Sequence, residues 1–229
     1  MAVTLIINGQ STEADPSLSL FDQAEALGID VPTSCRKQGK CKECMVEVVE
    51  GSEALSPMTE AELHLKGNFR LSCQTFVTGP GGQVRCHTMR RGHMRIERQA
   101  YGLPAGDQAL RLDPAVTRDG DRILIDGIEV ERSTAPIHGI AMDLGTTTVV
   151  VRLLDLESGE LIADTSFENP QRFGGSEIMS RIAYDTSHPG RLLMRTLAGY
   201  LSHAIEKFPV DPKAIYEMVV VGKIGRAHV

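Results

Sequence analysis

The clearest chemical signal in the sequence comes from four cysteines. Cys35, Cys41 and Cys44 fall within ten consecutive residues, and Cys73 follows after twenty-eight more. The chain has five cysteines, so any disulfide scheme leaves one unpaired, and clustered thiols that stay reduced indicate metal or redox chemistry. Three thiolates on one loop and a fourth from a distant strand can wrap a compact inorganic cluster, because the backbone amides of the loop also hydrogen-bond the sulfurs.

The residues between these cysteines suit such a cluster. Gly39 allows the backbone angles that a tight wrap requires. Arg36, Lys37, Lys40 and Lys42 offset part of the negative charge of four thiolates. A structural zinc ion is an alternative, but zinc sites usually present two short Cys-x2-Cys pairs and this sequence has one. The favoured prediction is an inorganic cluster, with zinc or inert cysteines as alternatives.

The fifth cysteine, Cys86, is predicted to play a different part. It lies in the strand pattern VRCHT, where a lone cysteine is most often a small buried side chain. His87 and His93 could join it as metal ligands, but their position beside several arginines favours a solvated strand end.

A second motif, GIAMDLGTTTVV, places Asp143 at the end of a hydrophobic strand, followed by Gly145 and three threonines. The amides and hydroxyls of such a turn can cradle phosphate, while the carboxylate reaches a magnesium ion through water. The alternative is an ordinary hairpin with a capping aspartate. The candidate phosphate-binding residues are Asp143, Gly145, Thr146 and Thr147.

Residues 1–88 are predicted to form a small α+β domain that positions the cysteines. The Asn8-Gly9 pair predicts a hairpin, and Ser19 and Gly28 mark the start and end of a short helix. The strands are expected over 3–8, 45–50, 70–77 and 83–89, and a second short helix over 59–65.

The rest of the chain is predicted to be a linker over 89–136 and a second domain over 137–229. Arginines, glycines and prolines mark the linker, and Asp126-Gly127 predicts a hairpin within it. In the second domain, strands are expected over 139–145, 146–156 and 160–168, helices over 176–185 and 190–208, and a buried strand over 217–222. A domain that stops one strand after its first long helix is expected to be truncated, soon after Val221.

Composition excludes several classes of function. The 229 residues include 30 acidic and 24 basic side chains, a net charge of -6, which disfavours a nucleic-acid partner. No apolar run approaches the roughly 18 residues of a membrane helix, and the first residues lack a basic leader. The sequence therefore predicts a cytoplasmic protein without a membrane partner.

The cysteine spacing C-x5-C-x2-C, with a later cysteine in a strand, resembles that of [2Fe-2S] ferredoxins of the β-grasp fold, in their adrenodoxin-like branch. The resemblance covers residues 1–88 and implies that Cys35, Cys41, Cys44 and Cys73 are the cluster ligands. One departure is Lys42, which stands where such loops usually have Gly, Ala or Ser.

The second half resembles another superfamily. D-x-G-T-T is similar to the first phosphate motif of acetate kinases, sugar kinases, Hsp70 and actin, whose domains are α/β and ribonuclease-H-like. ENPQRFGGSEIMSRIAYD resembles the corresponding segment of ferredoxin-fused members, the ATP-dependent reductive activators of corrinoid proteins. This implies the first part of an actin-like ATPase domain, with Asp143, Gly145, Thr146 and Thr147 contacting phosphate and magnesium.

The two resemblances together imply one-electron transfer to a corrinoid methyltransferase whose cobalt has been oxidised to Co(II). An upstream donor would load the cluster, and ATP and magnesium, bound by the complete parent only, would drive the uphill reduction to Co(I). The sequence offers no general base, so no catalytic residue is predicted. The alternatives are a plain ferredoxin that serves an oxygenase or dehydrogenase and, in a non-redox class, a zinc-stabilised interaction protein.

Overall fold

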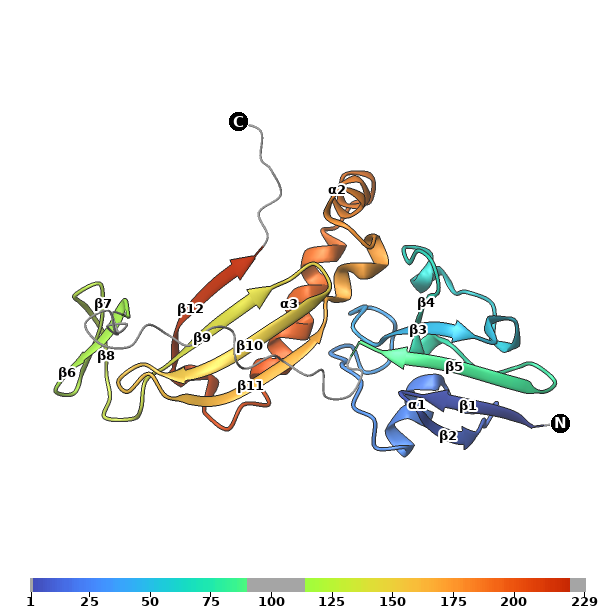
Figure 1. Ribbon diagram of the computed structural model, residues 1–229, viewed down its shortest axis with the longest axis horizontal. Helices are drawn as coiled ribbons and strands as arrows, with labels where there is room; N and C mark the ends of the chain where they lie inside the picture. The colour runs from blue at the N-terminus through green and yellow to red at the C-terminus, as the bar shows by residue number, and fades with distance from the viewer. Residues whose placement is uncertain (1, 90–113, 223–229) are drawn as a thin grey trace, which may run out of the picture.

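A computed structural model of the chain describes residues 2–89 and 114–222. The strands of this part of the chain form a five-stranded, a three-stranded and a four-stranded sheet, in chain order (Figure 1). None of the described helices is both long and apolar enough to cross a membrane.

The N-terminal domain is a mixed sheet with one α-helix, the β-grasp arrangement that the ferredoxin resemblance predicts. The strand order is β2-β1-β5-β3-β4, in which β1 and β5 are parallel and the other neighbours are antiparallel. The elements are β1 (Val3–Ile7), β2 (Gln10–Glu13), α1 (Leu20–Ala26), β3 (Met45–Glu50), β4 (Phe69–Leu71) and β5 (Gly82–Thr88).

Local sequence explains where α1 begins and ends. The Ser19 hydroxyl accepts a hydrogen bond from the Asp22 backbone N–H, and the Asp22 carboxylate accepts one from the Ser19 N–H, so both free amides are satisfied. Gly28 follows the helix at φ 71°, a conformation that glycine adopts readily. Both ends of this helix were predicted, and the cysteine loop follows directly after it.

Two other elements of this domain are shorter than predicted. The strand expected over 70–77 ends at Leu71, and Cys73 lies on a 3-10 helix, η3 (Ser72–Gln74). The Thr75 hydroxyl donates to the Leu71 carbonyl at 2.9 Å, which turns the chain back there. The helix expected over 59–65 is a single 3-10 turn, η2 (Glu60–Glu62), whose start is capped by the Glu62 carboxylate, which accepts a hydrogen bond from the Thr59 N–H.

A small antiparallel sheet precedes the second domain. It consists of β6 (Val116–Asp119), β7 (Arg122–Ile125) and β8 (Ile128–Arg132). Asp126 and Gly127 join β7 to β8 with φ values of 50° and 81°, as a two-residue hairpin turn requires, so the predicted hairpin is confirmed. His93 lies outside the described residues.

The second domain begins as a three-stranded meander and continues through two helices to a fourth strand. β9 (His138–Leu144), β10 (Thr148–Asp155) and β11 (Leu161–Glu168) are antiparallel, while β12 (Ile215–Gly222) returns parallel to β9. The order β11-β10-β9-β12 is the ribonuclease-H-like start that the sequence predicts. The intervening helices are α2 (Ile178–Ser187) and α3 (Leu192–Ile205).

Two predictions for this domain are wrong. β12 was expected to be buried, but it pairs only with β9 in the described sheet, and Met218 to Val221 are about half exposed. The sequence of the helix predicted over 176–185 places apolar residues, among them Met179 and Ile182, on one face and offers Ser176 as the cap, which predicts that this face of α2 is buried. Both side chains are exposed, and the cap is Glu177.

The buried residues of α2 are Arg181 and Tyr184. The Arg181 guanidinium donates to the backbone carbonyls of Gly175 and Thr146, and the Tyr184 hydroxyl donates to the His64 carbonyl of the N-terminal domain. Contacts with distant segments therefore decide which face of α2 is buried. The spacing of apolar residues along the helix gives no information about such contacts.

The two domains share one continuous hydrophobic core. The Tyr184 hydroxyl reaches the His64 carbonyl at 2.8 Å, and the Phe173 ring meets the His64 ring edge-on at 5.6 Å between centroids. Arg172 forms an ion pair across the boundary with Glu47. Figure 1 shows the loop between α1 and β3 on the side of the N-terminal domain that faces the second domain.

Candidate cluster site and phosphate-binding turn

The structure brings the four predicted cysteines together in two pairs. Cys35, Cys41 and Cys44 lie on the loop between α1 and β3, and η3 presents Cys73. The sulfurs of Cys44 and Cys73 are 3.3 Å apart and buried, while the thiols of Cys35 and Cys41 interact with each other at the half-buried end of the loop. No three His, Cys, Asp or Glu side chains in 2–89 and 114–222 are grouped so as to hold one metal ion.

The backbone of the loop is shaped to aim amides at these sulfurs. Cys35 accepts hydrogen bonds from the N–H groups of Gln38, Lys40 and Cys41, and the Gly39 N–H donates to Cys73. This needs left-handed backbone conformations, and the residues that adopt them are Arg36, Lys37, Gly39 and Lys42, at φ 53°, 65°, 69° and 66°. Alternating right- and left-handed residues turn successive amides toward one point and form an anion-binding concavity.

Lys42 departs from the small residue usual after the second cysteine of ferredoxin loops, and the structure shows how the chain accommodates it. A left-handed conformation is uncommon for a residue with a side chain. The Lys42 ammonium donates to the Ala61 carbonyl at 2.6 Å, which anchors the side chain on the segment before β4. The expected role of Lys42 in offsetting cluster charge is compatible with this position, because its ammonium interacts electrostatically with all four thiols.

The local environment separates the cysteine pKa values. A hydrogen bond from the Cys44 thiol lowers the pKa of Cys73 to about 6, and the same contact with burial raises the pKa of Cys44. Burial opposes ionisation of Cys35, but the amide donors outweigh it and lower its pKa, whereas burial raises the pKa of Cys41. Each pair thus combines one thiol with a lowered pKa and one with a raised pKa. The thiol with the raised pKa keeps its proton, and a bound cation could take the place of that proton.

These thiols fit a [2Fe-2S] cluster. Such a cluster is held by four cysteine thiolates, two on each iron, and is stabilised by hydrogen bonds to its sulfurs. The pairing of Cys35 with Cys41 and of Cys44 with Cys73 supplies the thiolates two by two, and the amides of the loop supply the hydrogen bonds.

Glu62 is a supporting residue that the sequence analysis missed. Its fully buried carboxylate accepts hydrogen bonds from the Leu71 N–H at 3.0 Å, the Thr75 hydroxyl at 3.2 Å and the Arg70 guanidinium at 2.8 Å. These partners flank η3 on both sides, so Glu62 holds Cys73 in place. The only sequence signal was the Thr59-x-x-Glu62 capping pattern, which gives no hint of the Arg70 contact.

Cys86 lies away from the cluster loop, as predicted. It is fully buried on β5, opposite Ile7 of β1 and Val48 of β3, and burial raises the pKa of its thiol to about 12. His87 follows on the same strand.

Three of the predicted phosphate-binding residues, Gly145, Thr146 and Thr147, form the turn between β9 and β10, and Asp143 lies near the end of β9. A side chain at Gly145 would put its Cβ 2.5 Å from the Thr148 carbonyl oxygen, so the turn requires glycine there. Asn169 ties the turn down: its side-chain amide donates to the Gly145 carbonyl at 2.9 Å, and its backbone N–H donates to the Thr147 carbonyl at 2.7 Å.

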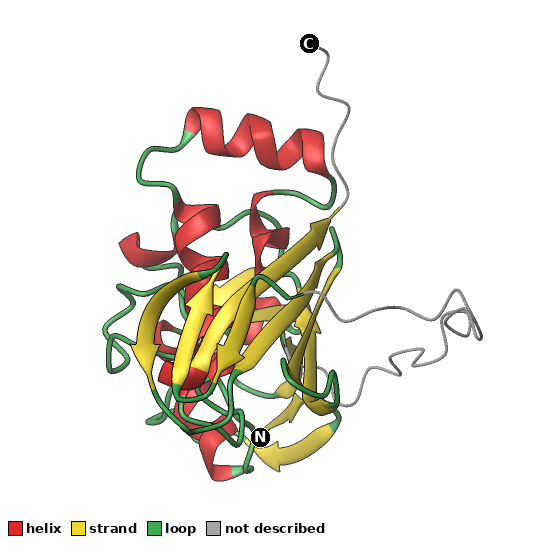
Figure 2. Ribbon diagram, turned by 90° about the vertical axis from the view of Figure 1, so that its left-hand side faces the viewer, coloured by secondary structure: helices red, strands yellow, loops and turns green. Residues whose placement is uncertain are grey.

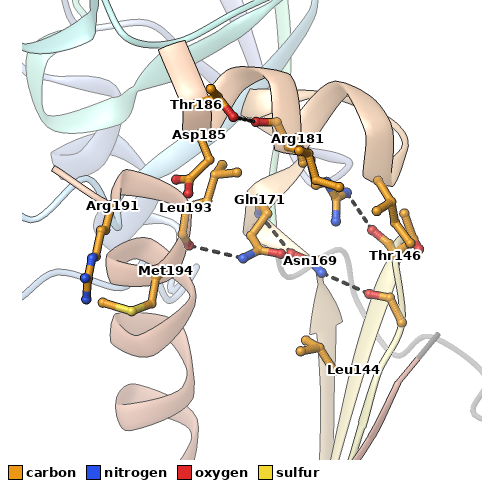
Figure 3. A pocket seen from close by; sticks show the side chains of 13 residues that line it. Leu144, Thr146, Asn169, Gln171, Arg181, Asp185, Thr186, Arg191, Leu193 and Met194 are labelled. Atoms are coloured by element: carbon orange, nitrogen blue, oxygen red, sulfur yellow. Dashed lines mark hydrogen bonds between the residues drawn. The ribbon is translucent and has the colours of Figure 1, made fainter. Parts of the chain in front are cut away.

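A cavity of about 560 Å³ opens beside this turn (Figure 3). Gly145 and Thr146 line it, together with charged and polar side chains that include Asn169, Gln171, Arg181, Asp185 and Arg191. Of the four predicted residues, Asp143 and Thr147 are not part of this lining, so the structure brings only half of the set to the cavity. α2 and α3 supply several of these lining residues, and Figure 2 shows α2 as the helix at the top of the molecule, beyond the ends of the strands.

Comparison with known proteins finds a family match in each half of the chain. Residues 5–78 match the family of 2Fe-2S iron-sulfur cluster binding domains, and residues 138–228 match the RACo middle region.

Three relatives illustrate the likeness. The corrinoid activation enzyme RamQ of Eubacterium limosum is 26% identical over 252 residues, which cover 90% of this chain and 42% of RamQ. An NADPH oxidoreductase of Mycobacterium tuberculosis is 32% identical over 77 residues, 34% of this chain and 20% of its own. The solved reductive activator for corrinoid, iron-sulfur protein is 19% identical, with a TM-score of 0.43 over 96% of this chain and 47% of its own. The chain thus spans less than half the length of these relatives.

Proposed function

We propose that this chain, in which a 2Fe-2S iron-sulfur cluster binding domain precedes a RACo middle region, carries single electrons in the reductive activation of a corrinoid protein. The observation that carries the proposal is the two-by-two pairing of the cysteine thiols inside a domain of the 2Fe-2S family. The likeness to RamQ, which spans both domains in the same order, supports the corrinoid partner.

Cys35, Cys41, Cys44 and Cys73 would hold the cluster. When bound, a [2Fe-2S] cluster accepts and donates one electron at a time, which matches the single electron between Co(II) and Co(I) cobalt. The buried pair anchors the site in the domain core, whereas Cys35 and Cys41 lie at the partly exposed end of the loop, where a partner can approach. Arg36 and Lys40 are exposed at this end and would lower the electrostatic cost of the thiolates.

The β9–β10 turn would take part in binding the ATP that drives the reaction. Reduction of Co(II) to Co(I) is uphill for such a donor, and we propose that ATP drives it in the complete protein. Asp143, Gly145, Thr146 and Thr147 would contact phosphate and magnesium, and the cavity beside the turn supports this role for Gly145 and Thr146, which line it. We also propose that an upstream electron donor loads the cluster and that the protein is cytoplasmic.

Cluster loading is the first test. The protein is reconstituted anaerobically with iron and sulfide, and its visible absorption and iron and sulfide contents are measured. We expect a brown protein with equal iron and sulfide, loss of the visible bands in Cys73→Ala, and retention of them in the matched control Cys86→Ala. An intact spectrum in Cys73→Ala, or a colourless protein that takes up only zinc, would contradict the proposal.

The corrinoid step is tested separately. The reduced, cluster-loaded protein is mixed with a Co(II) corrinoid methyltransferase protein, and the absorption of Co(I) is followed. We expect Co(I) to form only with ATP and the full-length protein, and not with Cys73→Ala. If the loaded protein instead reduces an oxygenase and leaves cobalt unchanged, it is a plain ferredoxin.

A further inference from the structure

Glu43 lies at the centre of an unusual contact on the cluster loop. Its carboxylate accepts a hydrogen bond from the Ser34 hydroxyl at 2.7 Å. The backbone N–H groups of the same two residues both donate to the Cys41 thiol. The side-chain bond between Ser34 and Glu43 therefore fixes the separation of the two amides that hold Cys41.

The second domain closes over this contact. Glu43 is only 7% exposed, and Gly199 of α3 lies against its carboxylate. A Cβ at Gly199 would lie 2.4 Å from a Glu43 carboxylate oxygen and 2.7 Å from its Cδ, so the Glu43 side chain would have to move to make room for it. Glycine in the middle of a helix is destabilising relative to alanine, so the close approach explains a residue that helix propensity disfavours.

Two further contacts hold α3 in this position. Asp30, which precedes the cluster loop, forms an ion pair with Lys207 and lies 3.5 Å from the His203 ring nitrogen. Tyr200, next to Gly199, is fully buried and packs against Phe167 of β11. α3 is thus anchored on its own sheet and on the N-terminal domain at once.

We propose that Glu43 is a positioning residue for electron transfer, and that α3 presses it into place through Gly199, so that docking of the second domain sets the reduction potential of the cluster. The inference rests on the proposed [2Fe-2S] cluster and adds to it a role for the second domain that is independent of nucleotide. Cluster potentials respond to hydrogen bonds at the sulfurs and to nearby charge, and Glu43 controls both at Cys41.

The sign of the charge effect follows from electrostatics. A carboxylate beside Cys41 disfavours the arrival of an electron, because the added charge is of the same sign. Removing that charge while keeping the side-chain shape should make reduction easier. Glu43→Gln is therefore expected to shift the midpoint potential to a more positive value.

The experiment measures midpoint potentials of the full chain by redox titration, followed in the visible absorption bands. Iron and sulfide contents are recorded for each variant. Glu43→Gln should give the positive shift, and Gly199→Ala should shift the potential because the methyl group displaces Glu43 from Ser34. The matched controls are Glu53→Gln, an exposed carboxylate on another segment, and Ser202→Ala, an exposed position on the same helix. Both should keep the original potential.

A double substitution separates a contact effect from a general disturbance of α3. In a Glu43→Ala background, Gly199→Ala should cause no additional shift, since the group it displaces is gone. If Gly199→Ala alone fails to assemble a cluster, adding Glu43→Ala should restore assembly. An equal shift in both backgrounds, or failure of that rescue, would overturn the inference. So would Gly199→Ala and Glu43→Gln proteins that load a normal cluster at the original potential, and this result would leave the proposed cluster itself intact.

Discussion

The cysteine loop and the β9–β10 turn are both marked by short sequence motifs, yet they are built in opposite ways. At the cluster site, all four predicted cysteines come together, three of them from the loop itself, and the backbone of that loop supplies most of the hydrogen bonds to the sulfurs. At the turn, Gly145 and Thr146 reach the cavity, but the charged and most of the polar side chains that line it come from segments 24 to 46 residues away from Gly145, between Asn169 and Arg191. A site whose functional residues lie mostly in one short segment can be predicted more completely from sequence than a site that distant segments complete.

The difference predicts which remote residues each region depends on. Outside the loop, the cluster site depends on the carboxylate of Glu62, which holds η3 and with it Cys73. The turn depends on Arg181, which ties the Thr146 carbonyl to the loop before α2. Substitutions at these two positions should therefore affect different halves of the molecule.

Glu62→Ala is expected to have the larger effect. It leaves the buried Arg70 guanidinium without its carboxylate and frees the Leu71 N–H, and breaking a buried ion pair in this way costs about 3–5 kcal/mol. The free energy of unfolding, measured by urea denaturation, should fall by that amount, and the protein should retain less iron after reconstitution.

The matched control for this prediction is Glu60→Gln, an exposed neighbour in the same 3-10 turn. It should leave both the unfolding free energy and the iron content unchanged. If Glu62→Ala retains iron normally, Cys73 is positioned by other contacts and the loop is more self-sufficient than we infer.

Arg181→Ala is expected to have a smaller effect, confined to the second region. It removes the donors of two partly buried carbonyls, those of Gly175 and Thr146, and each lost hydrogen bond costs about 0.5–1.5 kcal/mol. Urea denaturation should show this loss of stability, while the visible spectrum of the reconstituted cluster should keep its shape. Arg195→Ala, an exposed position on α3, is the control and should change neither. An altered cluster spectrum in Arg181→Ala would break the separation between the two regions.

The same contrast explains how much of the structure the sequence could predict. Ser19 and Asp126-Gly127 act within a few residues of themselves, and the helix start and hairpin that they predict are present. The burial of α2 depends instead on Tyr184 meeting His64, 120 residues away in the chain, and no local pattern encodes such a contact. β12 has a hydrophobic sequence typical of a central strand, yet hydrophobicity alone does not show which strands and helices lie beside it.

The cluster site shows the same limit. Its four candidate ligands follow from spacing and a resemblance, but Glu43 and Glu62 are invisible at that level, since glutamates in loops are ordinarily solvated. Only the fold reveals that one lies under α3 and the other beneath η3. The supporting residues of a site are therefore the part that sequence reasoning misses most.

The smallest predicted effect concerns the joint between the two regions and depends on pH. Burial, with a minor contribution from Lys42, lowers the pKa of His64 from 6.5 to about 4. Lys42 and His188 oppose its protonation, and the nearby Glu62 favours it. The unfolded chain takes up a proton near pH 6.5 that the folded chain refuses until about pH 4, so stability should be unaffected above pH 6.5 and should decline as the pH falls through this window.

The expected loss at pH 5 is on the order of 1–2 kcal/mol, because the ring is partly accessible to solvent. Urea denaturation of the full chain at pH 7 and at pH 5 measures it, and His64→Gln provides the reference, since acid damage to the cluster affects both proteins equally. The wild-type chain should lose more stability than His64→Gln between the two pH values. Equal losses would mean that His64 is protonated in the folded chain, and that the packing of its ring against Phe173 tolerates a charge.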